Sequence, residues 1–254
     1  MRRLQSFLIV AVVCAGTFAS VLHAQGRFPV GTAIAVALDQ SLDSRTCKPG
    51  ERVVGHVAQD VPLGRRVIHV DSKIFGQVTQ VENGLGQAKL GVRFERLDVG
   101  GERVAISVKA RAAASPVLVD TAGRPTNAAT SPVSWTMALV GNDMVYGVGG
   151  PVQDEMDNVV GKSVRGGVMV KLSNQPGSMC EGIPLSDQPQ PAWVFSSSAC
   201  GVFGLGNLQL ANGTEANAGE ILFSRRNKHE GERTTLKVPA GTALLLAITQ
   251  APAQ

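Results

Sequence analysis

The sequence predicts an all-β protein, a barrel or sandwich of about 9–11 strands with one short helical excursion in its middle. One observation is a terminal repeat. Segment 28–40 (FPVGTAIAVALDQ) returns as segment 238–250 (VPAGTALLLAITQ) at an offset of 210 residues, with six of thirteen positions identical. The other is period-two alternation of apolar residues in short segments separated by glycine-containing turns. We therefore expect the N- and C-terminal strands to lie in the same sheet.

Residues 1–24 have the layout of a secretory signal peptide. Arg2 and Arg3 precede an apolar run over 7–22, and Ala24 stands before the expected cut. An uncleaved anchor is the alternative, although the run is short for a spanning helix, which needs about 20 residues. We expect an exported protein that is periplasmic, associated with the outer membrane, or secreted.

Charge and aromatic content argue against a nucleic-acid-binding protein. The formal net charge is +4, basic and acidic residues are interspersed, and aromatic residues make up 4% of the chain. Nucleic-acid grooves combine clustered basic residues with stacking aromatic rings. We expect no nucleic-acid partner.

Three cysteines remain after the predicted cleavage: Cys47, Cys180 and Cys200. An exported protein permits a disulfide, and Cys180 with Cys200 is a possible pair that closes a proline-containing loop. Three unpaired thiols are the alternative, because sequence alone does not fix pairing. The chain has no Cys-x-x-Cys motif, so neither a zinc site nor a redox motif is predicted.

Residues 28–110 predict an N-terminal β-meander. In its first strand Ile34, Val36 and Leu38 share one face, and alanines at 33, 35 and 37 form the other. Because alanine is small, this second face would let a neighbouring layer approach closely. Later strands are expected over 52–60, 67–81, 89–96 and 103–109, separated by turns such as Glu82-Asn83-Gly84.

The middle of the chain predicts different structure. Residues 111–135 are rich in Ala, Ser, Thr and Pro and are interpreted as a linker. Residues 136–172 are interpreted as a helical excursion, in which a helix over 152–164 has an apolar side. That side would pack in the core or, alternatively, contact a membrane or a partner. Residues 173–192 are expected to be a loop, and residues 193–250 to supply C-terminal strands that complete the same β-domain.

A search for chemistry assigns no catalytic, cofactor-binding or metal-binding residue. His69 and Asp71 flank one position of an expected strand and His56 lies on its neighbour, but exposed strand positions explain them better. The acidic residues Glu95, Asp98 and Glu102 surround one hairpin, where charged outer faces are common. Gly161-Lys162-Ser163 lacks the leading glycine of a phosphate-binding loop. We predict a protein that is not an enzyme and needs no cofactor.

The segments GTAIAVALDQSLDSRTCKPGERVVGHVAQDV and VIHVDSKIFGQVTQVENGLGQAKLGVRFERLDVGGERVAISV carry a family resemblance. Their order of strands and turns resembles the β-domain of the bacterial conjugation TrbI-like family, the periplasmic scaffold proteins of type IV secretion channels. Similar domains occur in secreted bacterial proteins of unknown role. The sequence departs from the family in two ways. His69 and Asp71 stand where the family usually has Pro and Gly, and we find neither the inner-membrane helix nor the proline-rich spacer that channel members carry. We therefore expect a stand-alone relative of the outer-layer domain.

Three functional hypotheses follow. The first is a non-enzymatic structural or assembly protein of the cell envelope, TrbI-like, that associates with itself or with envelope proteins. The second is a secreted module that binds glycan or peptidoglycan. The third is an envelope hydrolase that uses the histidines or acidic residues.

Overall fold

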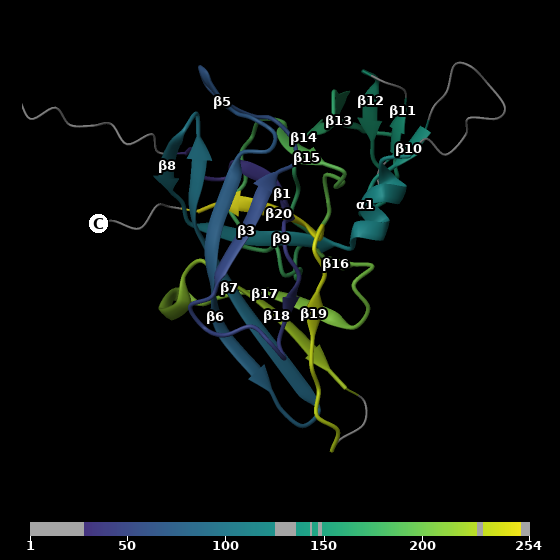
Figure 1. The fold of residues 1–254 in the computed structure, drawn as a ribbon. Coiled ribbons are helices and arrows are strands. Elements are labelled where there is room, and N and C mark those ends of the chain that lie inside the picture. Colours follow the sequence, from purple (N-terminus) through teal and green to yellow (C-terminus); the bar gives the residue numbers. More distant parts are fainter. Residues whose placement is uncertain (1–27, 125–135, 143, 147–148, 228–230, 250–254) are drawn as a thin grey trace, which may run out of the picture.

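The computed structural model describes residues 28–124, 136–142, 144–146, 149–227 and 231–249. It is a mostly β structure in which a ten-stranded sheet curls into a nearly closed barrel and a six-stranded sheet packs against the outside of that barrel (Figure 1). This confirms the predicted fold class. The helix α1 (Pro116–Ala122) lies beside the second sheet.

The ten-stranded sheet contains strands from both ends of the chain. In spatial order it consists of β16 (Gly201–Phe203), β9 (Val108–Ala114), β20 (Ala243–Ile248), β1 (Ala33–Leu38), β3 (Arg52–Val57), β6 (Lys73–Asn83), β7 (Gln87–Val99), β18 (Glu220–Arg226) and β17 (Leu208–Asn212), with β8 (Glu102–Ala105) paired to β7. Two short ladders lie beside it: β2 (Leu42–Asp43) with β19 (Lys237–Val238), and β4 (Val61–Leu63) with β5 (Arg66–Ile68).

The two copies of the terminal repeat lie in this one sheet, as predicted, and are direct neighbours there. Strands β1 and β20 pair antiparallel, with Ala33 opposite Ala247. The Gly31 N–H donates to the Ile248 carbonyl at 2.9 Å, and the Gly241 N–H donates to the Leu38 carbonyl at 2.7 Å. Because 31 and 38 become 241 and 248 at the repeat offset, these two hydrogen bonds are equivalent. The two copies therefore have equivalent roles in one strand pair.

Both glycines of the repeat have left-handed backbones, with φ of 84° at Gly31 and 75° at Gly241. Each stands inside a turn that the following threonine closes: Thr32 N–H donates to Pro29 O and Thr242 N–H donates to Pro239 O. A side chain would be strained at such φ values. This explains why the Pro-x-Gly-Thr entry is present in both copies.

Aliphatic side chains fill the barrel interior. Ile34, Val36 and Leu38 of β1 point inward and are at most 2% exposed. They pack against inward side chains from the other strands, including Phe94 of β7 and Phe223 of β18. A barrel of about eight strands has an interior just wide enough for side chains to fill. The interior is thus a packed core.

Asn212, the last residue of β17, closes the barrel against β9. Its Oδ1 accepts the Ala110 N–H at 2.7 Å, and its Nδ2 donates to the Ala110 carbonyl at 2.9 Å. The side-chain amide therefore satisfies both backbone groups of a residue that is fully buried. It replaces the ladder hydrogen bonds that a direct β17–β9 pairing would supply.

The second sheet is a meander in sequence order. It consists of β10 (Thr136–Ala138), β11 (Met144–Tyr146), β12 (Pro151–Gln153), β13 (Val159–Val164), β14 (Gly167–Val170) and β15 (Gln190–Trp193). It packs on the alanine face predicted from β1. Ala33 and Ala35, with Ala112, Ala114 and Ala243, form one buried cluster with side chains of the second sheet such as Val168 and Val170. The small residues allow the layers to approach, as expected.

Buried glutamines join the two layers. Gln59, which is 3% exposed, donates to Val168 O at 3.1 Å and accepts the Trp193 N–H at 2.6 Å. Gln190 accepts the Ala33 N–H at 3.1 Å. Each amide satisfies backbone groups at the junction that would otherwise be buried without a partner.

The predicted helix over 152–164 is wrong, as is the helical excursion over 136–172. This segment contains the β12–β13 hairpin instead, whose turn is built by Asp154: its Oδ1 accepts the Met156 and Asn158 N–H groups at 2.9 Å. A Cβ at Gly161 would overlap the Met169 carbonyl of β14. The apolar residues at helical spacing in fact belong to the two strands and the turn between them. Because residues 152–164 form no helix, the alternative in which such a helix contacts a membrane or a partner has no basis in this structure.

The predicted linker over 111–135 is also wrong where the structure describes it. Strand β9 continues to Ala114, and Ser115 then caps α1 by accepting the Leu118 N–H at 3.3 Å, with Pro116 in the first turn. The expected loop over 173–192 is irregular until β15 begins at Gln190, and β15 joins the second sheet instead of the C-terminal strands. The remaining predicted C-terminal strands appear as β16 to β20, with a short 3₁₀ turn over Glu215–Asn217.

Candidate functional site

The histidines and Asp71 do not form one site. His56 Nδ1 lies 2.5 Å from Asp39 Oδ1, and Lys73 Nζ lies 3.0 Å from Asp39 Oδ2. His69 instead faces Asp60, at 3.6 Å. Asp71 lies in the turn before β6 with a φ of 68°. The two described histidines thus belong to separate surface ion pairs, and His229 lies outside the described residues.

Cys180 and Cys200, the pair considered from the sequence, form a disulfide with a Cα–Cα distance of 6.0 Å. Cys180 is fully buried, and the segment that precedes it is held to the barrel by Arg111 of β9, which donates to Asn174 Oδ1 and to Ser173 O. Arg111 is itself fully buried, and desolvation lowers its pKa to about 10. Cys47 is a buried free thiol whose pKa is raised by desolvation, which makes it a poor nucleophile.

Two of the three acidic residues at the β7–β8 hairpin, Glu95 and Asp98, have separate partners, and Glu102 is an exposed residue of β8. Glu95 accepts a hydrogen bond from Gln77 at 2.8 Å, and Asp98 lies 3.6 Å from Arg103. This arrangement does not pair two carboxylates. Two arginines, Arg96 and Arg103, line the same hollow as Glu95.

A groove of about 290 Å³ lies on the outer face of the barrel over β3, β6, β7 and β8, and we call it the arginine groove. It is lined by Arg52, Phe75, Gly76, Glu95, Arg96 and Arg103. The guanidinium carbons of Arg52 and Arg103 lie over the Phe75 ring, 4.8 and 5.0 Å from its centroid. The ring thereby holds two cations near one another on an exposed surface.

The charges of the arginine groove are unbalanced. Arg103 has Asp98 as a partner, but Arg52 and Arg96 form no ion pair with any residue that the structure describes. Glu95, the carboxylate in the lining, is engaged by Gln77. Three guanidinium groups therefore have two carboxylates beside them, Glu95 and Asp98, and the excess positive charge favours an anion.

A second groove, of about 450 Å³, continues along the same strands, and we call it the polar groove. Its polar lining comprises Gln77, Thr79, Gln80, Arg93, Asn217 and Glu220. Glu220 is 5% exposed, and its Oε1 accepts hydrogen bonds from Thr79 Oγ1 and Gln80 Nε2. The Nε atom of Arg93 is buried with no hydrogen-bond partner in the described part of the chain. Gln77 joins the two grooves through its bond to Glu95.

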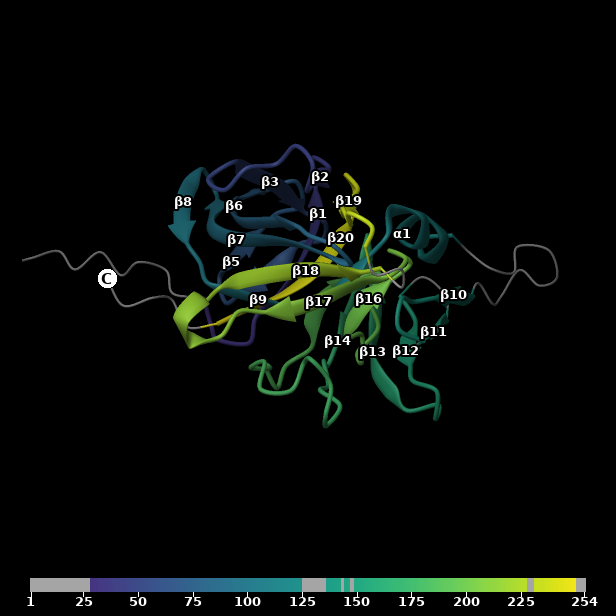
Figure 2. The same cartoon turned by 90° about the horizontal axis from the view of Figure 1, so that it is seen from below.

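The two grooves lie on the barrel face opposite the second sheet. Figure 2 shows β3, β6 and β8 on the side of the barrel away from β12, β13 and β14. Phe75 and Gln77 occupy alternate outward positions of β6 while Ile74 and Val78 are buried inside, and a β-bulge after Val78 brings Thr79 and Gln80 together to the polar groove. We call these two neighbouring grooves, whose linings are joined by the hydrogen bond from Gln77 to Glu95, the furrow.

Sequence reasoning missed the furrow. Its residues are single outward positions on strands that are far apart in the chain, and each alone is typical of a solvated face. The available signal was Phe75, a large aromatic residue in the outward register of a strand whose inward residues are Ile74 and Val78. Its neighbours could be found only once the strand order β3-β6-β7-β18 was known.

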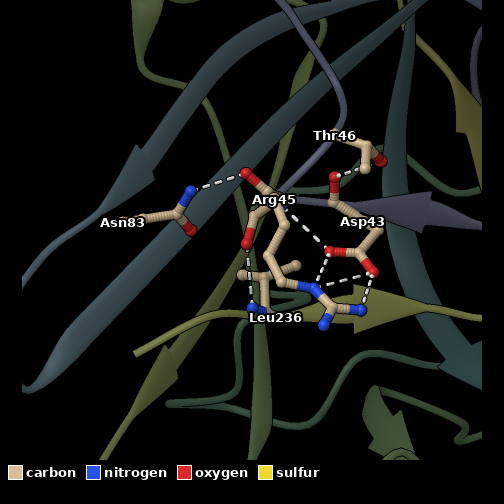
Figure 3. A network of polar contacts seen from close by, with 6 residues as sticks. Asp43, Arg45, Thr46, Asn83 and Leu236 are labelled. Carbon is tan, nitrogen blue, oxygen red and sulfur yellow. Dashed lines mark hydrogen bonds and ion pairs between the residues drawn. The ribbon is translucent and has the colours of Figure 1, made fainter. Parts of the chain in front are cut away.

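A polar network at another edge of the barrel is structural. Figure 3 shows Asp43 and Arg45 in a two-pronged ion pair, with Arg45 Nη2 at 2.6 Å from Asp43 Oδ2. The hydrogen bond from Arg45 holds the pKa of Asp43 at about 2. Ser44 accepts hydrogen bonds from Asn83 Nδ2 and from the Leu236 N–H, which ties β2 to β6 and to the segment before β19. These hydrogen bonds join one part of the chain to another, so the network stabilises the fold.

Comparison with known proteins gives no match: no family model, no curated protein and no solved structure is significantly similar to the chain. Among the described residues, no group of three or more histidine, cysteine, aspartate or glutamate side chains is arranged to hold a metal ion. Within the same residues, helices long and apolar enough to cross a bilayer are absent.

Proposed function

We propose that this protein is an exported, non-enzymatic β-domain protein with a structural or assembly role in the bacterial cell envelope, similar to the TrbI-like scaffold domains. The observation that carries the proposal is the position of the accessible charged and polar side chains. Side chains fill the barrel interior, and the unbalanced charges line a furrow on its outer face. Such a surface suits contact with an extended envelope component.

Two further observations support an extracytoplasmic location. The signal-peptide layout of residues 1–24 directs export, and the disulfide Cys180–Cys200 is stable in an oxidising compartment. A location in the periplasm or at the outer membrane follows from this proposal. Association with further copies or with envelope proteins would give the rigid barrel its structural role.

Envelope fractionation followed by native sizing tests the proposal. The processed chain, starting at Gln25, is expected in the periplasmic or outer-membrane fraction, in a species larger than the monomer. A Cys180→Ser/Cys200→Ser variant serves as a control for the role of the disulfide in that fraction. Recovery of the wild-type chain as a cytoplasmic protein, or as a free monomer after gentle osmotic release, would contradict the proposal.

A further inference from the structure

The arginine groove has the chemistry of an anion site. Arg52 and Arg96 have no ion pair among the described residues, and both line the same hollow as Arg103. A guanidinium group binds a planar carboxylate through two parallel hydrogen bonds. The Phe75 ring restricts Arg52 and Arg103 in advance, so less side-chain entropy is lost when an anion binds.

The polar groove has the chemistry of a hydroxyl-binding site. Gln77, Gln80 and Asn217 each offer a donor and an acceptor, as a sugar hydroxyl does. Thr79 and Gln80 both bond to Oε1 of Glu220, and no other described residue is hydrogen-bonded to its Oε2. The buried Nε atom of Arg93 is an unused donor beside it. A buried donor without a partner is costly, so a ligand hydroxyl or water that reaches it would be favoured.

The two grooves are aligned along β6. From Phe75 to Gln80, with the bulged Thr79 adding no rise, the strand rises by about 13 Å, and Gln77 lies between them and bonds to Glu95 of the arginine groove. This length exceeds that of one monosaccharide. The furrow therefore fits a short chain that carries an anionic group at one end and hydroxyl groups along its length.

Other polymer classes fit the furrow less well. Strands β3, β6, β7 and β18 each have a neighbour on both sides in the sheet, and β8, which pairs only with β7, is four residues long, so the site offers only a short free edge to an added peptide strand. Nucleic-acid strands bind by stacking bases on aromatic rings. Phe75 is the aromatic residue in the lining of the two grooves, and two guanidinium groups already lie over its ring.

We propose that the furrow is a binding site for an acidic carbohydrate, with a sugar carboxylate in the arginine groove and neighbouring hydroxyl groups in the polar groove around Glu220. This site does not depend on the proposed assembly role. It requires only the barrel face formed by β3, β6, β7, β8 and β18, with Asn217 beside it.

Calorimetric titration of the purified mature protein tests the site with three probes: trigalacturonic acid, neutral maltotriose and a glutamate trimer. Trigalacturonic acid should bind, and its affinity should fall as salt is added. The other two probes should bind at least tenfold more weakly. Equal binding of maltotriose would overturn the role of the carboxylate, and equal binding of the glutamate trimer would overturn the choice of a carbohydrate.

Variants locate the ligand. Arg52→Ala and Arg96→Ala should each lower the affinity for trigalacturonic acid by on the order of tenfold, the loss expected for one hydrogen bond to a charged group. Asn217→Ala should lower the affinity for trigalacturonic acid. It should leave the weaker binding of monomeric galacturonic acid unchanged, because Asn217 lines only the polar groove. Arg124→Ala is the matched control, since Arg124 lies after α1 and pairs with Asp120.

An equal loss in the Arg124→Ala variant would contradict the site, as would unchanged binding in both furrow arginine variants. All four positions are exposed, so circular dichroism should show folded proteins. Failure of this titration leaves the envelope fractionation result intact. Conversely, a monomeric cytoplasmic protein that bound trigalacturonic acid through Arg52 would refute the assembly role alone.

Discussion

Asn212 offers a sharp test of how the barrel closes. Its side chain is the partner of both the N–H and the carbonyl of Ala110, which is fully buried. An unsatisfied buried backbone group costs about 1–3 kcal/mol. Asn212 is itself partly exposed, so water would replace part of the lost bonding. We therefore expect Asn212→Ala to lower the free energy of unfolding by about 2 kcal/mol in total.

Urea denaturation measures this loss through the transition midpoint and the slope of the unfolding free energy. Asn212→Asp sharpens the test, because it keeps an acceptor for the Ala110 N–H but turns a carboxylate oxygen toward the Ala110 carbonyl. At neutral pH it should destabilise at least as much as Asn212→Ala. Asn158→Ala is the control, since Asn158 is exposed and its side chain bonds only to Asp154.

The reasoning would be refuted by an Asn212→Ala variant within about 0.5 kcal/mol of the wild type, the range of ordinary surface substitutions. It would also fail if Asn158→Ala cost as much. In either case the contact between β17 and β9 would not depend on the amide.

Three further predictions concern the layers, the ion pair and the disulfide. Ala35→Leu should destabilise by about 1–3 kcal/mol in urea, because it overpacks the interface between the barrel and the second sheet; a neutral effect would show that the layers are loosely packed. The pKa of Asp43 is lowered to about 2 by Arg45, so its stabilising effect is present above pH 4 and is lost as pH falls toward 2. The stability difference between wild type and Asp43→Asn should therefore be below about 1 kcal/mol at neutral pH and shrink over that range, and a difference that grows on acidification would contradict this. Cys180→Ser/Cys200→Ser should cost about 3 kcal/mol, the value for a loop of this length, and an unchanged melting temperature would argue that the disulfide contributes little.

The parts of the fold that could be predicted have signals in local sequence. The terminal repeat predicted the β1–β20 pair because the same Gly-Thr turn and alternating strand occur in both copies. The alanine face of β1 predicted a close layer because small side chains in a strand leave room for one. Each signal is contained in a thirteen-residue segment, and the first also requires only that the two copies be compared.

The parts that were missed depend on contacts that the spacing of apolar residues does not reveal, and two of the three examples join residues distant in sequence. The 152–164 segment has apolar residues at helical spacing, and only the turn built by Asp154 and the contact of Gly161 with β14 make it a hairpin. Asn212 closes the barrel on Ala110, 102 positions away. The furrow likewise joins Arg52, Phe75 and Glu220 from three separate strands. A single sequence contains no signal for contacts between residues that lie so far apart in the chain.

Photo-cross-linking in intact bacteria tests the central claim, which is that the furrow contacts other components of the envelope. Ala216→p-benzoylphenylalanine places a reactive group on the exposed turn beside Asn217 of the polar groove and leaves the groove arginines in place, and Val117→p-benzoylphenylalanine places one on α1, where Val117 is 73% exposed. We predict high-mass adducts from position 216 and few or none from position 117. Adducts of equal yield from both positions, or none from position 216, would contradict it.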